Sequence, residues 1–183
     1  MASLKARLAS GNPHKLEELR AALPDWELEL LEPAEPFPDE GGESYYENAR
    51  AKAEFGRRVG EPGVWVLGED SGIEVAALGG APGIASARWA EDGVAQLLVE
   101  LDGVAERSAR YVCELVALSP GGEERRGTGI LEGAITAERR GAEGFGYDPI
   151  FVPDGEERTV AELGDAWKRE HSHRARAAFD LGG

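Results

Sequence analysis

The stretch ARLASGNPHKLEELRAAL (residues 6–23) passes from a short strand through a tight turn into a helix. The strand ends at Gly-Asn-Pro, and apolar residues then return at helical spacing at Leu16, Leu19 and Leu23. Because a strand, a turn and a helix in this order form half of an αβ unit, the stretch predicts a fold that mixes helices with a sheet.

The rest of the chain continues this mixture. We expect further strands at 26–31, 64–67, 73–75, 110–118 and 127–135, and further helices at 44–59, 94–101 and 161–164. Residues 165–181 are expected to form a terminal helix or a helix pair. Ser44 and Glu47 have the spacing of a capping box at the start of one helix. The Pro120-Gly121-Gly122 turn joins two strand candidates, which predicts an antiparallel pair. These patterns predict an α/β fold around a mixed sheet, with loops at strand ends forming a cleft.

Length and charge limit the function classes. The 183 residues fit a single domain over 1–183, and 20 Lys and Arg against 35 Asp and Glu give a formal net charge of −15. Extended duplex nucleic acid is therefore excluded as a partner, whereas a small anionic ligand is not, because a metal ion and a few basic residues can reverse the field locally. The sequence has no secretory signal and no apolar run of about 18 residues, which predicts a cytoplasmic protein that does not enter a membrane.

Two motifs have the chemistry of a phosphate and metal site. In SGNPHK (10–15), free backbone N–H groups at a helix start and a lysine favour anion binding, although an ordinary helix entry has the same pattern. GEDSG (68–72) follows an apolar strand and reads as a polar turn whose two acids bind a cation, or as a solvated turn. A second acidic group, Asp39-Glu40, precedes the helix that starts at Ser44 and could supply another ligand or form a charged loop.

Two further motifs have the chemistry of a base-binding site. GFGYDP (144–149) combines aromatic rings, a carboxylate and glycines, so that a flat ring could stack there while Asp148 reads its edge, or it could be a plain turn. The C-terminal segment holds a basic cluster in an acidic chain, which is also typical of a solvated helix face. The cluster comprises Lys168, His171, His173 and Arg174.

In their order along the chain, these motifs resemble the inosine/xanthosine triphosphate pyrophosphatases, also called the HAM1-like family. The likeness extends from SGNPHKLEEL through ESYYENARAKA, EDSGIEVAALGGAPGIASARWA and GFGYDPIF to KREHSHRARA. It implies an α/β fold with an elongated mixed sheet flanked by helices, in two lobes around a central substrate cleft, and a homodimer. The implied activity is Mg²⁺-dependent hydrolysis of ITP, dITP and XTP to the monophosphate and pyrophosphate, which removes these nucleotides from the pool.

The resemblance also implies roles for individual residues. Asp70 would be the catalytic carboxylate and a metal ligand, Glu40 the second ligand of Mg²⁺, and Ser71 a substrate contact. The phosphates would be held by Ser10, Gly11, Asn12, Pro13, His14, Lys15 and Lys52. The base and ribose would be enclosed by Phe145, Gly146, Tyr147 and Asp148, with Lys168, His173 and Arg174 closing over the purine edge.

The sequence departs from the family pattern at several positions. Glu69 stands where Asp is usual and Ser10 where Thr is usual, and His171 stands where an apolar residue is usual. The loop before Ser44 matches poorly, so Asp39 or Glu35 could replace Glu40 as the second metal ligand. Two other functions are consistent with parts of the pattern: a Maf-like dTTP or UTP pyrophosphatase, and a nucleotide-binding protein without catalysis.

Overall fold

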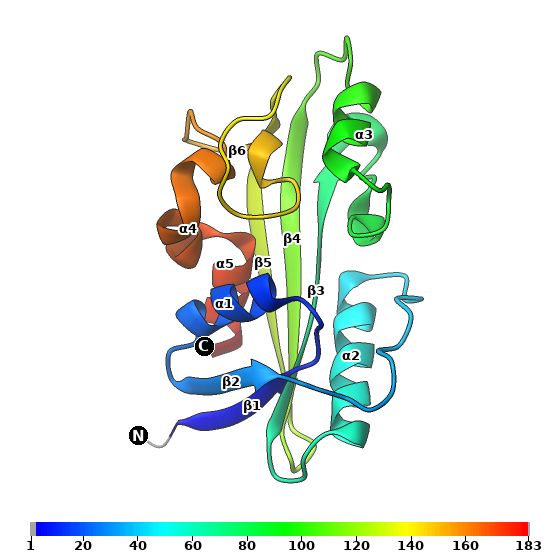
Figure 1. Cartoon of the computed structure of the whole chain (residues 1–183), viewed down its shortest axis with the longest axis vertical. Coiled ribbons are helices and arrows are strands. Elements are labelled where there is room, and N and C mark those ends of the chain that lie inside the picture. Colours follow the sequence, from blue (N-terminus) through cyan, green and yellow to red (C-terminus); the bar gives the residue numbers. More distant parts are fainter. Residues whose placement is uncertain (1–2, 183) are drawn as a thin grey trace. The chain divides into compact units, whose positions relative to one another are not determined.

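A computed structural model describes residues 3–182, in which helices and strands alternate along the chain (Figure 1). The strands are β1 (Leu4–Leu8), β2 (Trp26–Leu30), β3 (Trp65–Val75), β4 (Ser108–Leu118), β5 (Glu124–Ile135) and β6 (Phe151–Pro153). The α-helices are α1 (Pro13–Ala22), α2 (Tyr45–Val59), α3 (Gly93–Glu100), α4 (Val160–His171) and α5 (His173–Gly182).

The strands form a mixed sheet in the order β2-β1-β3-β4-β5-β6. Strand β1 pairs in parallel with β2 and β3, whereas β6 pairs antiparallel with β5. Strands β4 and β5 are neighbours joined by the predicted turn, where the Ser119 N–H donates to the Glu123 carbonyl. The prediction of an α/β fold with a mixed sheet is confirmed.

The chain divides into two compact units. The first comprises residues 1–70, 113–129 and 174–183, and the second comprises 71–112 and 130–173. Strands β3, β4 and β5 contribute residues to both units.

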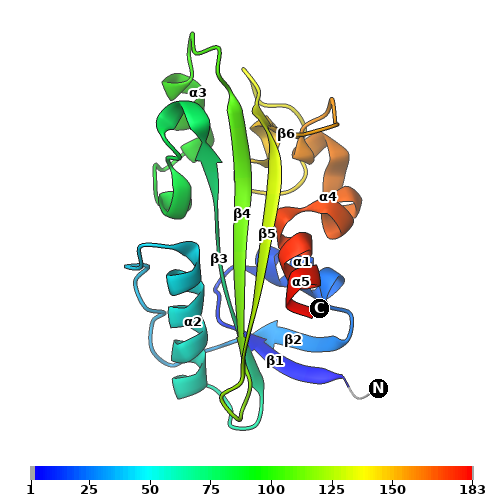
Figure 2. The ribbon, with the colours of Figure 1, turned by 180° about the vertical axis from the view of Figure 1, so that it is seen from behind.

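In the first unit, helices cover both faces of the sheet (Figures 1 and 2). Helices α1 and α5 pack on one face, around a core that includes Leu19, Leu67 and Leu115. Helix α2 packs on the other face, where Val66 contributes to one small cluster and Val116 to another. Because side chains alternate along a strand, neighbouring residues such as Val66 and Leu67 serve opposite cores.

In the second unit, one apolar cluster joins α3 and α4 to the ends of the long strands. Its members include Ile73 from β3, Leu97 from α3, Ile135 from β5 and Val160 from α4. Phe151 of β6 is fully buried in the same cluster. This core fixes the loop that contains GFGYDP, because Tyr147 and Ile150 also belong to it.

Local capping explains where the helices begin. The Asn12 side chain accepts the His14 N–H at the start of α1, and the Ser44 hydroxyl accepts the Glu47 N–H at the start of α2. Thr159 and Glu162 form a complete capping box at α4. The predicted helix at Ser44 is therefore confirmed, and the segment predicted as a terminal helix or helix pair is the later part of α4 followed by α5.

One prediction about the chain path was wrong. Residues 64–67 and 73–75 were expected to be separate strands around a polar turn at 68–72, but β3 runs without a break from Trp65 to Val75. The acids Glu69 and Asp70 are buried in this strand, where lysine and arginine side chains pair with them. A buried acid with a charged partner does not need a turn to reach water, so the strand continues.

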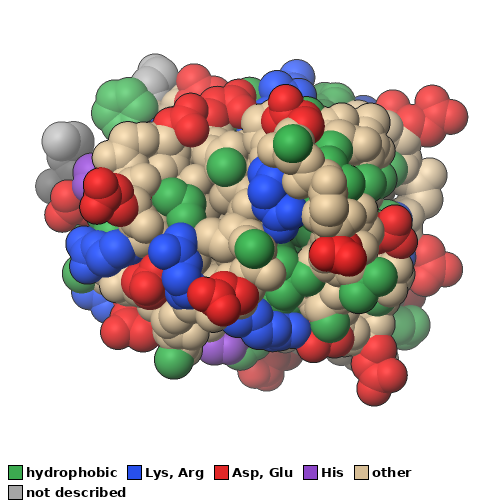
Figure 3. All heavy atoms as spheres, turned by 90° about the horizontal axis from the view of Figure 1, so that it is seen from above, with side chains coloured by type: hydrophobic (Ala, Val, Ile, Leu, Met, Phe, Trp, Pro, Cys, Tyr) green, Lys and Arg blue, Asp and Glu red, His purple; other side chains and the backbone are tan. Residues whose placement is uncertain are grey.

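The surface carries the acidic character of the chain. Figure 3 shows Asp and Glu side chains around the edge of one face, with Lys and Arg side chains among them. Within residues 3–182, no helix has the length and apolar character needed to cross a membrane.

Candidate active site

The SGNPHK segment forms the entry to α1, as its sequence predicts. The Ser10 hydroxyl accepts the backbone N–H of Asn12 at 3.1 Å, the Asn12 side chain accepts the His14 N–H at 3.0 Å, and Pro13 takes the first helical turn. Gly11 and His14 are exposed. An exposed loop that leads into the positive end of a helix is suited to binding phosphate.

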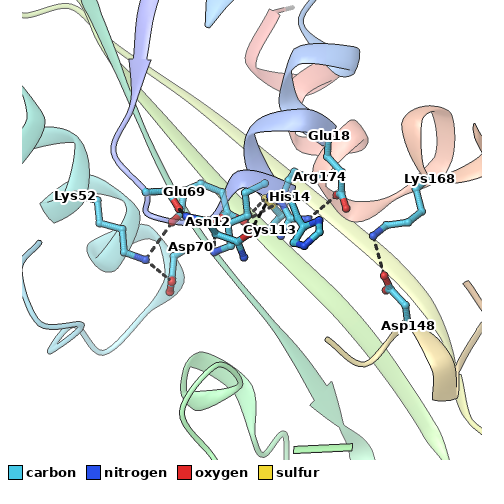
Figure 4. A network of polar contacts seen from close by, with 12 residues as sticks. Asn12, His14, Glu18, Lys52, Glu69, Asp70, Cys113, Asp148, Lys168 and Arg174 are labelled. Atoms are coloured by element: carbon cyan, nitrogen blue, oxygen red, sulfur yellow. Dashed lines mark hydrogen bonds and ion pairs between the residues drawn. The ribbon is translucent and has the colours of Figure 1, made fainter. Parts of the chain in front are cut away.

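The carboxylates of the adjacent acids of β3 have different partners, although Lys52 Nζ also donates to the backbone carbonyl of Glu69 at 3.1 Å (Figure 4). Glu69 meets Lys15 of α1 and Arg174 of α5 on one side of the strand. Asp70 meets Lys52 of α2 on the other side. Because successive side chains of a strand alternate, two neighbouring carboxylates have separate environments here and do not share one cation.

Asp70 lies in a network that α2 builds around it. Its Oδ1 accepts from Lys52 Nζ at 2.9 Å, and its Oδ2 accepts from Asn48 Nδ2 at 3.1 Å. Burial raises the pKa of the Asp70 carboxyl, although the ammonium of Lys52 opposes the shift. Burial alone would lower the pKa of Lys52, but the charges of Asp70 and Glu40 outweigh it and the pKa of Lys52 is raised. The lysine is therefore charged at neutral pH.

Glu40 joins the same network. Its Oε1 accepts from Lys52 Nζ at 2.5 Å, so the carboxylates of Glu40 and Asp70 converge on one ammonium. Of the other two acids considered as the second metal ligand, Glu35 pairs with Arg58 on the surface at 2.7 Å, and Asp39 is exposed.

Glu69 is completely buried between two cations. Lys15 Nζ lies 2.5 Å from its Oε2, and the Nε and Nη2 atoms of Arg174 each donate to its Oε1 at 3.0 Å. Burial alone would raise the pKa of the Glu69 carboxyl, but the charges of Lys15 and Arg174 lower it well below its ordinary value. Glu69 therefore ties the lysine of the SGNPHK segment to α5.

Arg174 is held at both ends of its guanidinium. Its Nη1 donates to Glu18 Oε2 at 2.6 Å, and the side chain is buried. Cys113 of β4 lies beside the Glu69 carboxylate, with its Sγ 3.6 Å from Glu69 Oε1. Burial and the charge of Glu69 raise the pKa of this thiol well above its ordinary value, which agrees with its predicted role as a small core residue.

In the second unit, the carboxylate of Asp148 organises the GFGYDP loop (Figure 4). Its Oδ2 accepts from Lys168 Nζ at 2.7 Å and from the backbone N–H of Phe145 at 2.9 Å. Lys168 Nζ also lies over the Phe145 ring, 4.5 Å from its centroid. The structure thus brings together an aromatic ring, a carboxylate and an ammonium from segments 20 residues apart.

The remaining predicted residues have different surroundings. Tyr147 is buried, and its hydroxyl donates to the Ser86 carbonyl at 3.0 Å. Gly146 is exposed with a φ of 62°, a conformation that glycine adopts readily. Ser71 is half-buried in β3, and His171 packs its ring against Trp167 at the end of α4.

Asn48 is a site residue that sequence reasoning missed. Its Nδ2 donates to Asp70, and its Oδ1 accepts the backbone N–H of Gly42 at 2.9 Å, so it ties the acidic loop to β3. The chain contains two asparagines, Asn12 and Asn48, and both have positions in these networks. The scarcity of asparagine in the chain, together with the position of Asn48 on the buried face of an amphipathic helix, is the signal in the sequence that could have identified this residue.

Comparison with known families and proteins gives a consistent result. The model of the Ham1 family matches residues 6–182. A protein of Bdellovibrio bacteriovorus named dITP/XTP pyrophosphatase is 40% identical, with 93% of this chain and 92% of that protein covered. A protein of the same name from Gloeobacter violaceus is 42% identical, with coverage of 95% and 90%.

Solved structures agree with these sequence matches. A HAM1 protein from Coxiella burnetii superposes with a TM-score of 0.81 at 35% identity and covers 97% of this chain and 96% of its own. A nucleoside-triphosphatase, also called dITP/XTP pyrophosphatase, from Mycobacterium abscessus gives a TM-score of 0.72 at 37% identity, with coverage of 91% and 93%. The likeness thus extends over nearly the whole chain in both sequence and structure.

Proposed function

The chain belongs to the Ham1 family, and from this membership we propose that it hydrolyses non-canonical purine nucleoside triphosphates to the monophosphate and pyrophosphate. The substrates are ITP, dITP and XTP, and the enzyme removes them from the nucleotide pool. The observation that carries the proposal is the convergence of Glu40 and Asp70 on Lys52, because cleavage of a triphosphate needs both cationic and carboxylate groups.

We propose that the first unit binds the triphosphate. The N–H groups at the start of α1 and the side chains of Lys15 and Lys52 supply the positive charge. Asp70 accepts a proton from the attacking water, whose oxygen bonds to the α-phosphorus while the bond to the bridging oxygen breaks and pyrophosphate leaves. Lys52 and Asn48 hold the Asp70 carboxylate in place during this step.

The donor set fits Mg²⁺. Residues 3–182 hold no cluster of three or more Asp, Glu, His or Cys side chains placed for a metal, but Mg²⁺ is commonly held by one or two carboxylates together with waters and substrate phosphates. Asp70 and Glu40 would be those carboxylates. The two acids and Lys52 leave a net charge of about −1, so an anionic nucleotide needs a further cation there. When bound, the metal neutralises the phosphates and polarises the phosphorus centre.

The base is assigned to the second unit. We propose that Phe145, Asp148, Lys168 and His173 contact the purine, and that donors directed at its 6-oxo group discriminate against adenine. In the structure, the Arg174 guanidinium is bonded to Glu69 and Glu18. Its contact with the base stays a prediction. We further propose that the enzyme is cytoplasmic, because nucleotide pools are used there. We also propose that it forms a homodimer, and light scattering after gel filtration tests this oligomeric state.

The test of the function is pyrophosphate release from ITP, XTP, dTTP, UTP, GTP and ATP with Mg²⁺, repeated with excess EDTA. We expect turnover of ITP and XTP that EDTA abolishes. Turnover of dTTP or UTP without ITP would support the Maf-like alternative, and binding of ITP without turnover would support the non-catalytic one.

The test of the catalytic residue is Asp70→Asn. Loss of a general base lowers kcat by about 10²–10⁴, while ITP binding is retained. The matched control is Glu74→Gln, which neutralises another acid of β3 that pairs with Arg110 at 2.7 Å. Equal activity of the two variants would contradict the role of Asp70.

A further inference from the structure

Tyr111 of β4 touches two of the proposed base-binding residues at once. It is buried, and its hydroxyl donates to Asp148 Oδ1 at 3.2 Å. Its ring stacks on the imidazole of His173, with centroids 4.5 Å apart and the planes inclined by 6°. The Tyr111 ring also packs against the ring of Phe151, with centroids 4.7 Å apart, and this contact holds the tyrosine in place.

The contacts of Asp148 show what the tyrosine hydroxyl does. Tyr111 donates to Oδ1 of the carboxylate, and Lys168 and the Phe145 N–H donate to Oδ2. The Oδ2 bonds hold the loop and the lysine, whereas the Oδ1 bond fixes the rotation of the carboxylate about its own axis. Loss of the tyrosine hydroxyl removes one of the bonds that hold the carboxylate in this rotation, which weakens the alignment of the two Oδ2 bonds.

The stack performs a second, separable task. His173 lies directly after Ser172, where the backbone leaves α4 in an extended conformation before α5 begins. The aromatic face of Tyr111 sets the plane of the imidazole at this junction. One side chain on a rigid strand therefore orients a carboxylate through its hydroxyl and an imidazole through its ring.

From these contacts we propose that Tyr111 is a positioning residue for purine binding, which aligns Asp148 and His173 without touching the substrate. The proposal rests on the function proposed above, since it takes these two residues as base contacts. It adds a specificity-determining position in the interior of the sheet, outside the motifs of the sequence.

The experiment compares Tyr111→Phe with wild type. The substitution removes the hydroxyl and keeps the ring, so the stack on His173 and the packing on Phe151 remain. We expect KM for ITP to rise about 10–150-fold, the scale of losing a hydrogen bond to a charged group, with kcat changed by less than about twofold. Inorganic triphosphate has phosphates and no base, so its inhibition constant should stay within about twofold of wild type.

The matched control is Tyr46→Phe, which removes a hydroxyl that donates to the Glu124 carboxylate at 2.7 Å on the surface of the first unit. It should leave both constants unchanged. Tyr111→Leu removes the stack as well and should raise KM for ITP further than Tyr111→Phe does. If the leucine variant does not fold, the phenylalanine variant alone decides.

The outcomes separate the two proposals. A wild type that turns over no ITP overturns the proposed function and this inference together. A wild type that turns over ITP, with a KM that is the same in Tyr111→Phe and Tyr46→Phe, overturns the inference alone. An equal loss of affinity for ITP and inorganic triphosphate would show a general structural defect and would also overturn it.

Discussion

Replacing Gly68 by alanine should separate helix α2 from strand β3. A Cβ atom at this position would lie 1.9 Å from the Ala49 carbonyl oxygen and 2.7 Å from the Ala53 nitrogen, both backbone atoms of α2. Ordinary contact begins at 3.4 Å, so the two backbones must move apart by about 1.5 Å. That movement acts on the hydrogen bond of 2.9 Å between Lys52 and Asp70, because the first belongs to the helix and the second to the strand.

The expected magnitudes follow from this displacement. Overpacking of this kind costs about 1–3 kcal/mol, which in a chain of 183 residues lowers Tm by about 2–12 °C. Misplacement of a catalytic group by about 1 Å lowers kcat by about 10²-fold. Tm is measured by circular dichroism, and kcat for ITP by pyrophosphate release at a temperature where the variant is folded.

The control for Gly68→Ala is the same substitution at Gly121. This glycine lies in the turn between β4 and β5, where a Cβ atom would meet nothing closer than Ser119 Oγ at 3.8 Å. We expect Gly121→Ala to change neither Tm nor kcat appreciably. If Gly68→Ala retains the kcat of Gly121→Ala despite a lowered Tm, close approach of α2 is not what positions Lys52 against Asp70.

Two further predictions concern charged side chains. Arg174→Ala leaves Glu69 and Glu18 without their shared cation in a buried site, which should cost about 3–5 kcal/mol and lower Tm by about 6–20 °C, whereas exposed Arg176→Ala on the same helix should have little effect. The ratio of ITP to GTP turnover by Arg174→Ala, measured below its melting range, tests the predicted contact of Arg174 with the base. A ratio equal to that of wild type rejects this contact. At Asp92, the N-cap bond from Ala95 and the ion pair with Arg139 lower the carboxyl pKa, so its stabilisation is present above about pH 4 and is lost as the pH falls through the lowered value. Asp92→Asn should therefore melt below wild type at pH 7, and the gap should narrow as the pH falls further below about 4; a gap that does not change with pH would contradict this linkage.

Local signals in the sequence located most helices because the groups that start a helix lie within a few residues of one another. The helix predicted at α4 begins at residue 161, without use of the capping box of Thr159 and Glu162, whereas Ser44 and Glu47 predict the start of α2. Pro13 and Asn12 do the same for α1, whose start falls two residues before the predicted position. Each of these signals depends on hydrogen bonds between near neighbours, so a sequence pattern contains the whole interaction.

The path of β3 could not be predicted in this way, because its cause is distant in sequence. The GEDSG segment is polar, and polar residues between glycines are typical of turns. The structure buries Glu69 beside Lys15 and Arg174, which lie 54 and 105 residues away in the chain. The position of Tyr111 beside the proposed base-binding residues could not be predicted for the same reason, since Asp148, which accepts from its hydroxyl, lies 37 residues away in the chain. Tertiary charge pairing thus overrides the local preference, and a single sequence does not contain the pairing.

The basic cluster near the C-terminus shows how a single break redistributes the charges of a segment. Lys168 and Arg174 are six positions apart, but Lys168 pairs with Asp148 in the second unit and Arg174 pairs with Glu69 in the first. The break lies at Ser172, whose extended backbone ends α4 before α5 begins at His173. Serine directly before a helix is a common N-cap residue, so the sequence contains the sign of this break. Cations on the two sides of such a serine therefore have to be assigned separately: Lys168 belongs with the GFGYDP loop, and Arg174 belongs with the buried acid of β3.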